Sequence, residues 1–237
     1  MLNRYFIAIF SLLLFGNASA FSIPERLQYD LKWTGIKAGT AVLEIKKEDG
    51  NTISIISQAT SAGWVSVFYR VQDRTESKVS AGSIMPLRYC IKLKEGKHRR
   101  DKEVIFDHKG GKVTYIDHLS GEKKEFNISG KVFDPLSGFF YLRQLPLEVG
   151  KSVYLPIFDS KKLWDVEVSV LRKEKIKTSL GTFDTIVIMP LMKSEGIFSR
   201  EGDILIWLTD DEKRIPIRLK SKVKIGSITA ELVEGKY

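Results

Sequence analysis

Residues 27–59 have the sequence LQYDLKWTGIKAGTAVLEIKKEDGNTISIISQA, and this stretch decides the fold. Apolar and polar side chains alternate along it from Leu27 and Tyr29 onward. A period of two is typical of a β-strand with one buried face. Turn residues at Gly35 and at Asp49–Asn51 divide the stretch, so it predicts a three-stranded antiparallel meander.

The same alternation continues along the rest of the chain. Turn-forming residues again separate the apolar runs, and no spacing typical of a strand–helix–strand unit occurs. Including the opening meander, we predict about thirteen strands. The further ones are expected at residues 71–77, 88–94, 103–107, 113–117, 153–158, 163–173, 176–179, 183–190, 204–208, 215–221 and 227–233. The predicted class is all-β: an antiparallel meander curled into a barrel or half-barrel, with one or two short helices packed on it.

Two segments depart from the alternation and predict short helices. Residues 61–69 place apolar side chains at helical spacing. In the second segment Asp134 can cap the free N–H groups of a helix that begins at Pro135. Its apolar face, which must dock on a sheet, consists of Leu136, Phe139 and Phe140.

The first 20 residues have the layout of a secretory signal peptide. Arg4 precedes an apolar run over residues 5–15, which is too short to span a bilayer, and small residues stand at Ala18 and Ala20. We predict cleavage after Ala20 and export to the periplasm. The mature chain is then a single β-rich domain over residues 21–237 that does not span a membrane, with a possible seam near residues 134–146. An uncleaved N-terminal anchor is the alternative.

The composition limits the partners and the chemistry. The formal net charge is +9, but Lys and Glu are interspersed, which argues against a nucleic-acid partner. The single cysteine, Cys90, cannot form an intramolecular disulfide, and we expect a core thiol. No catalytic motif and no phosphate-binding loop occurs, so we predict no enzyme activity, no cofactor and no metal. Asp107-His108 and Asp117-His118 could meet across a hairpin as a metal site, although water-facing strand ends explain them more simply.

Aromatic residues remain as candidates for binding. Filling the core is their simpler explanation, but a curled sheet capped by helices often leaves an apolar cavity. The candidate ligand-binding residues are Trp33, Trp64, Phe68, Tyr69, Phe139, Tyr141 and Trp207.

The chain resembles an exported bacterial family known as domain of unknown function 3108. Its motifs appear in order along nearly the whole mature chain: Tyr29-x-x-x-Trp33-x-Gly35-Ile36-x-Ala38-Gly39, Asp134-Pro135-Leu136-Ser137 with Tyr141 and Arg143, Gly202-x-x-x-x-Trp207-Leu208-Thr209-Asp210-Asp211, Arg214-Ile215-Pro216 and Ile225-Gly226-Ser227-Ile228. The resemblance implies a periplasmic, β-rich, meandering fold and no activity that can be transferred.

Four of these motif positions carry structural expectations of their own. Arg143 is too far from Asp134 to pair along one helix face, so we expect an acidic partner on the sheet. Pro216 cannot donate a ladder hydrogen bond and indicates an edge or a bulge. Gly39, like Gly35, suits a tight turn or a close approach of strands.

The function expected from these observations is a non-catalytic periplasmic protein that binds an apolar ligand or lipid in a curled β-sheet. The main alternative is a structural or interaction protein of the cell envelope that binds protein or polysaccharide. A carbohydrate hydrolase, which would need two acids facing one cleft, is the least favoured reading.

Overall fold

The computed structural model of the chain describes residues 22–191, 204–223 and 225–237. The signal peptide predicted at residues 1–20 lies outside these ranges. The described part consists of fourteen strands and two short helices. In chain order these are β1 (Glu25–Trp33), β2 (Ile36–Lys47), β3 (Thr52–Ser61), α1 (Gly63–Ser66), β4 (Gln72–Ser80), β5 (Pro86–Glu95), β6 (His98–Asp107), β7 (Lys112–Asp117), β8 (Glu122–Asn127), α2 (Pro135–Leu142), β9 (Ser152–Asp159), β10 (Lys162–Thr178), β11 (Gly181–Leu191), β12 (Ile204–Thr209), β13 (Pro216–Lys222) and β14 (Ser227–Lys236).

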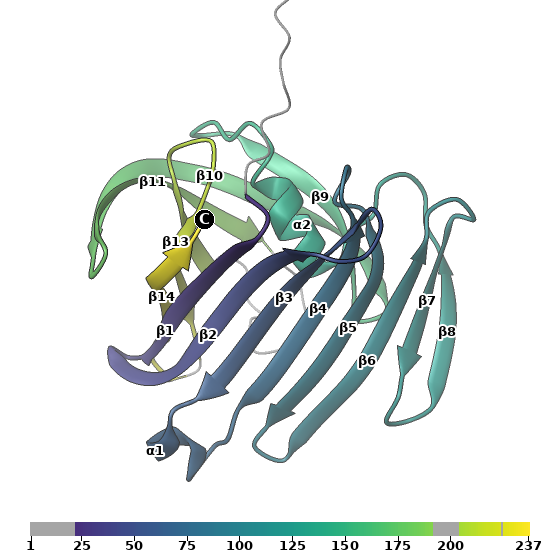
Figure 1. Cartoon of the computed structure of the whole chain (residues 1–237), viewed down its shortest axis with the longest axis horizontal. Coiled ribbons are helices and arrows are strands. Elements are labelled where there is room, and N and C mark those ends of the chain that lie inside the picture. The colour runs from purple at the N-terminus through teal and green to yellow at the C-terminus, as the bar shows by residue number, and fades with distance from the viewer. Residues whose placement is uncertain (1–21, 192–203, 224) are drawn as a thin grey trace, which may run out of the picture.

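All described strands belong to one antiparallel sheet (Figure 1). The strand order is β8-β7-β6-β5-β4-β3-β2-β1-β14-β13-β12-β11-β10-β9. Neighbouring strands of the sheet are consecutive in sequence except β1 and β14, and the consecutive strands β8 and β9 lie at opposite ends of the sheet. The β1–β14 pairing joins the first and the last described strands in the middle of the sheet. The predicted antiparallel meander is therefore confirmed.

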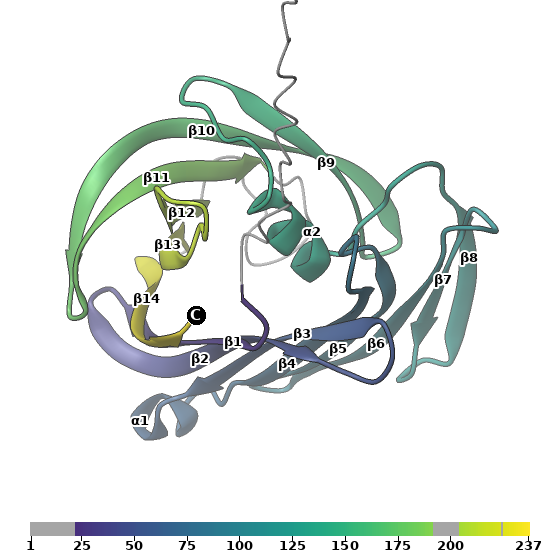
Figure 2. The ribbon, with the colours of Figure 1, turned by 45° about the horizontal axis from the view of Figure 1, so that its top comes forward.

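The sheet curls so that its two ends approach each other, and α2 lies between the opposing walls (Figure 2). The two edge strands of the described sheet, β8 and β9, do not pair with each other, so backbone hydrogen bonds do not close the sheet into a barrel there. Side chains bridge the ends instead. The rings of Phe126 and Phe158 lie 5.2 Å apart, and Lys161 Nζ lies 2.8 Å from Glu122 Oε2.

The core lies between α2 and the curled sheet. One apolar cluster joins Phe133 and Leu142 to β9–β12, and another joins Phe140 to β2, β3 and β4. α2 contacts β9 on one wall and β3 and β4 on the other. The helix therefore fills space that a sheet of this length could not fill by itself.

Two details differ from the pattern of the sequence. The edge strand β8 has the sequence EKKEFN and no alternating burial, because an edge strand exposed to water does not need an apolar face. Residues 163–173 and 176–179, predicted as two strands, form the single strand β10. A bulge between Val170 and Arg172 carries this strand through its charged segment.

Several local expectations are confirmed. α1 covers part of the predicted 61–69 segment, but none of its residues is buried, and it lies at the end of the sheet rather than on it. Pro216 lies opposite Leu208 at a register shift, the predicted bulge. A Cβ on Gly39 would lie 2.4 Å from the backbone oxygen of Thr60, so this position requires glycine for a close approach of β2 and β3.

Candidate ligand-binding pocket

The helix α2 is fixed to the sheet at its first turn. Asp134 is fully buried, and its Oδ1 accepts hydrogen bonds from the backbone N–H groups of Leu136 (2.8 Å) and Ser137 (3.0 Å). Its Oδ2 accepts from the hydroxyls of Ser77 on β4 (2.5 Å) and Ser137 (2.8 Å). Burial raises the pKa of Asp134, and these hydrogen bonds oppose that rise because they stabilise the carboxylate. The predicted N-cap is therefore also a tether to the sheet.

The other end of α2 is held by a buried ion pair. Arg143 Nη1 and Nη2 donate to Glu25 Oε1 and Oε2 over 2.7 and 2.9 Å, and Nη2 also donates to the backbone oxygen of Lys213 over 2.9 Å. Glu25 is the first residue of β1. The predicted acidic partner of Arg143 on the sheet is thus Glu25.

With both ends fixed, one side of α2 faces an apolar pocket of about 230 Å³, which we call the inner pocket. Leu136 and Phe139 border it from the helix. Strands β1–β3 and β12–β14 supply the remaining walls, which include Tyr29, Leu43, Ile206, Leu219 and Ala230.

Small side chains explain why space remains in this pocket, and a hydrogen-bonded hydroxyl explains why its lining is mainly apolar. Two alanines line the pocket: Ala41 on β2, which pairs with Tyr29 of β1, and Ala230 on β14. Larger apolar side chains at these inward-facing positions would occupy the space of the pocket. The Tyr29 hydroxyl donates to the Pro216 backbone oxygen over 2.9 Å. Burial raises the pKa of Tyr29, so the hydroxyl stays neutral. The lining is mainly apolar, and its charged residue, Arg218 on β13, donates to Glu231 Oε2 over 2.6 Å.

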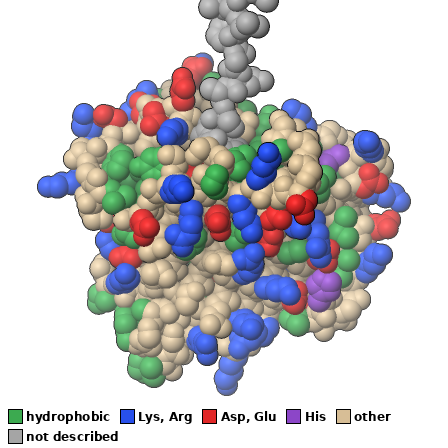
Figure 3. All heavy atoms as spheres, viewed as in Figure 1, with side chains coloured by type: hydrophobic (Ala, Val, Ile, Leu, Met, Phe, Trp, Pro, Cys, Tyr) green, Lys and Arg blue, Asp and Glu red, His purple; other side chains and the backbone are tan. Residues whose placement is uncertain are grey.

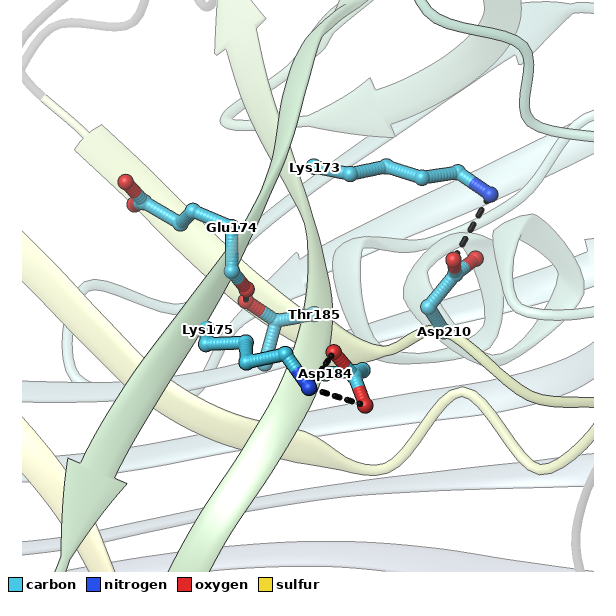
Figure 4. A pocket seen from close by; sticks show the side chains of 6 residues that line it. All are labelled: Lys173, Glu174, Lys175, Asp184, Thr185 and Asp210. Atoms are coloured by element: carbon cyan, nitrogen blue, oxygen red, sulfur yellow. Dashed lines mark hydrogen bonds and ion pairs between the residues drawn. The ribbon is translucent and has the colours of Figure 1, made fainter.

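A second, polar pocket of about 290 Å³ lies on β10, β11 and the segment after β12 (Figure 4). Its charges compensate one another. Lys173 Nζ lies 2.6 Å from Asp210 Oδ2, and Lys175 Nζ lies 3.1 Å from Asp184 Oδ1. The Lys173 ammonium holds the pKa of Asp210 below its usual value. Each of the two aspartates is therefore paired with a lysine, Asp210 with Lys173 and Asp184 with Lys175.

The seven predicted ligand-binding aromatics are not brought together. Phe139 lines the inner pocket. Tyr141 stacks on Phe133 with ring centroids 4.5 Å apart, and Trp207 is buried with its indole N–H donating to Glu174. The other four, Trp33, Trp64, Phe68 and Tyr69, are exposed at one end of the sheet.

The two aspartate–histidine pairs are separated, which overturns the idea that they meet across a hairpin. Asp107 and Asp117 stand at opposite ends of the β6–β7 ladder. His108 Nε2 lies 2.8 Å from the Pro86 backbone oxygen, and His118 Nε2 lies 3.0 Å from Glu103 Oε2. The described residues include no group of three or more His, Cys, Asp or Glu side chains arranged for a metal. Cys90 is half-buried on β5, and burial raises the pKa of its thiol.

Sequence reasoning missed most of the pocket lining. It favoured aromatic residues, whereas aliphatic and small residues from strands distant in the chain form most of the walls. Alanines inside apolar alternations, such as Ala41 and Ala230, were the available signal. A small residue where a large one is expected marks either a close contact or a space.

The architecture defines a class of proteins: one curled antiparallel sheet that packs around an inserted helix. The chain belongs to the family described as protein of unknown function (DUF3108), whose model matches residues 28–233. No curated protein matches the chain in sequence. Within the described residues, no helix is both long enough and apolar enough to cross a membrane.

Several solved structures are similar to the chain at low sequence identity, and the one from Brucella abortus shares its fold. A β-barrel-like protein of domain of unknown function DUF1849 from Brucella abortus has a TM-score of 0.58 and 14% identity, covering 91% of this chain and 98% of that one. The hypothetical protein CT021 from Chlamydia trachomatis has a TM-score of 0.41 and 8% identity, covering 93% and 90%. A provisionally described exported protein with a YmcC-like fold from Bacteroides fragilis has a TM-score of 0.33 and 10% identity, covering 92% and 97%.

Proposed function

We propose that this protein is an exported, non-catalytic periplasmic protein that binds an apolar ligand, such as the acyl chain of a lipid, in the inner pocket. The signal sequence at residues 1–20 supports the compartment. The observation that carries the proposal is the apolar pocket between α2 and the sheet, with Phe139 on one side and Ala230 on the other.

The size and lining of the pocket favour a narrow apolar guest. Its volume of about 230 Å³ is below the ~300–1,000 Å³ of most ligand pockets, so it suits one acyl chain or part of one. The polar group of Tyr29 is already bonded to Pro216, so a guest without hydrogen-bonding groups leaves no buried partner unsatisfied. Binding would then depend on apolar contact and on the available space.

The test fills the pocket and measures binding. Ala230→Phe places a ring in the inner pocket, whereas Thr229→Phe places the same ring on the opposite face of β14. Native mass spectrometry of protein purified from the periplasm and titration with an anthroyloxy-labelled fatty acid give the two readouts. We expect Ala230→Phe to weaken binding at least tenfold and Thr229→Phe to change it less than twofold, with thermal melts checking that both fold.

Two results would count against the proposed binding of an apolar ligand. A wild-type protein without co-purified lipid and without saturable fatty-acid binding would overturn the proposal. One dominant macromolecule trapped by cross-linking in cells, in the absence of lipid binding, would favour an interaction protein of the envelope instead.

A further inference from the structure

Apolar side chains gather at one end of the sheet, away from the inner pocket. They come from the β1–β2 turn, from α1 with the residues that follow it, and from the β13–β14 turn. We call this surface the aromatic rim and define it as Trp33, Ile36, Trp64, Val67, Phe68 and Ile225. Phe68 is 85% exposed, Val67 77% and Ile225 75%. A contiguous group of large apolar side chains exposed to solvent usually marks an interaction site.

Hydrogen bonds hold the rim in place. The indole N–H of Trp33 donates to the backbone oxygen of Ile225 over 2.8 Å, and that of Trp64 donates to the backbone oxygen of Lys37 over 3.0 Å. The backbone N–H of Thr34 donates to Ser227 over 2.8 Å. Each indole therefore has its polar atom bonded to the protein while its ring remains exposed, and three turns are joined into one surface.

A basic hairpin borders the rim. Tyr69 packs against Gly96 in the β5–β6 turn, and the Gly96 N–H donates to the backbone oxygen of Arg70 over 2.8 Å. Arg70, Lys97 and Arg99 are exposed around this junction. The acids closest in the chain, Asp73, Glu95 and Asp101, are half-buried, so the cations dominate the accessible surface.

Figure 3 shows both features on one face of the molecule. Hydrophobic side chains gather over α1 and over the β1–β2 turn at the lower left, and Lys and Arg side chains lie next to them over the β5–β6 turn at the lower edge. Protruding aromatic and aliphatic side chains flanked by cations are the composition that proteins use at the boundary between acyl chains and headgroups.

We propose that the aromatic rim docks on the surface of a lipid bilayer that carries anionic headgroups. Phe68 and Val67 enter the boundary of the acyl chains, the indoles of Trp33 and Trp64 lie at headgroup level, and Arg70, Lys97 and Arg99 contact the anionic phosphates. Charge complementarity selects this occupant over a protein partner. The inference goes beyond ligand binding and does not depend on the inner pocket.

The test compares two double variants on vesicles. Val67→Ser with Phe68→Ser removes an aliphatic and an aromatic side chain from the rim. Val149→Ser with Tyr154→Ser removes the same kinds of side chain, also exposed, from the β9 side of the molecule. Co-sedimentation uses the periplasmic protein with phosphatidylcholine vesicles and with vesicles that contain 30% phosphatidylglycerol.

We expect wild-type protein and the β9-side variant to bind the anionic vesicles equally, and the rim variant to bind at least tenfold more weakly. Lys97→Glu with Arg99→Glu should weaken binding to anionic vesicles at least tenfold, since each cation near such a surface contributes about fivefold. Higher salt should weaken wild-type binding. The Ala230→Phe variant should still bind vesicles, and the rim variant should still bind fatty acid, which separates this proposal from the pocket.

Tryptophan quenching supplies an independent readout. Brominated acyl chains should quench wild-type fluorescence, and Trp33→Phe with Trp64→Phe should abolish the quenching while Trp164 and Trp207 still emit. The proposal would be overturned if wild-type protein did not bind anionic vesicles, or if the rim variant bound them as well as wild type. A cross-linked protein at the rim without vesicle binding would assign the surface to a protein partner instead.

Discussion

Arg143, at the end of α2, forms a two-point ion pair with Glu25, at the start of β1, and both side chains are almost completely buried. The two residues are 118 positions apart in the chain. The pair therefore joins the inserted helix to the strand in the middle of the sheet. Because α2 also borders the inner pocket, this contact helps to determine the position of the pocket wall.

Breaking this pair should destabilise the protein strongly. Arg143→Met leaves the Glu25 carboxylate buried without its cation, which costs about 3–5 kcal/mol in the free energy of unfolding. Urea denaturation measures this cost. Glu25→Leu combined with Arg143→Met should recover most of the loss, because no buried charge remains. The exposed pair Lys151–Glu148 is the control, and Lys151→Met should cost at most about 1 kcal/mol. A small loss in Arg143→Met alone would contradict the assignment.

Replacing the N-cap residue Asp134 by alanine should destabilise the protein more than replacing it by asparagine. Asp134→Ala removes the acceptor of two backbone N–H groups and leaves the buried Ser77 hydroxyl without this partner, so we expect a loss of about 2 kcal/mol. Asp134→Asn retains an amide oxygen for the helix and should cost clearly less. Thermal melts of the two variants provide the comparison, and equal losses would argue against capping as the main role.

The close approach at Gly39 should not tolerate a methyl group. A Cβ there would lie 2.4 Å from the Thr60 backbone oxygen, and a backbone atom can move aside only if the strands separate. We expect Gly39→Ala to cost about 1–3 kcal/mol in chemical denaturation. At Gly82 a Cβ would meet nothing within 4 Å, so Gly82→Ala should stay within about 0.5 kcal/mol of wild type. Similar stabilities of the two variants would refute this reading.

Glu103 should make the free energy of unfolding decrease as the pH falls into the acidic range. The Arg88 guanidinium, with Nε 2.6 Å from Glu103 Oε1, lowers the pKa of this carboxyl, and His118 adds to the effect. A lowered folded-state pKa means that the stabilisation is present above the ordinary glutamate pKa of about 4.3 and disappears as pH falls through the lower folded value.

Glu103→Gln should therefore lower stability at neutral pH and reduce the loss seen on acidification. Denaturation curves between neutral pH and pH 3 check both effects. Glu125→Gln, in the exposed Lys112–Glu125 pair, is the control and should change stability at neutral pH by at most about 1 kcal/mol. An unchanged acid limb in Glu103→Gln would rule out this carboxyl as its source.

The strands and helix ends were predictable because their signals are local. Alternation in residues 27–59 depends only on which face of each strand meets water, and Asp134-Pro135 contains the N-cap and the first helical residue in adjacent positions. β8 escaped prediction because an edge strand of charged residues has no such alternation. The long β10 was divided because its charged segment interrupts the apolar pattern.

The inner pocket was less predictable because it is formed by contacts between distant segments of the chain. Phe139 meets Tyr29, Ile206 and Ala230 only after the sheet curls around α2. The exposed location of Trp64 and Phe68 is also a tertiary result, since an aromatic residue in a short helix has the same local pattern whether it faces the core or the solvent.

By itself the sequence determined the all-β class, the antiparallel meander, the capped helix and the need of Arg143 for an acidic partner. All of these follow from side-chain alternation, capping chemistry and the cost of an unpaired buried charge. Only the tertiary structure decided that the partner is Glu25, that small residues leave a pocket beside α2, and that four of the aromatics form part of an outer surface. The degree of curl decides these points, and it accumulates over the fourteen described strands rather than being specified by any one of them.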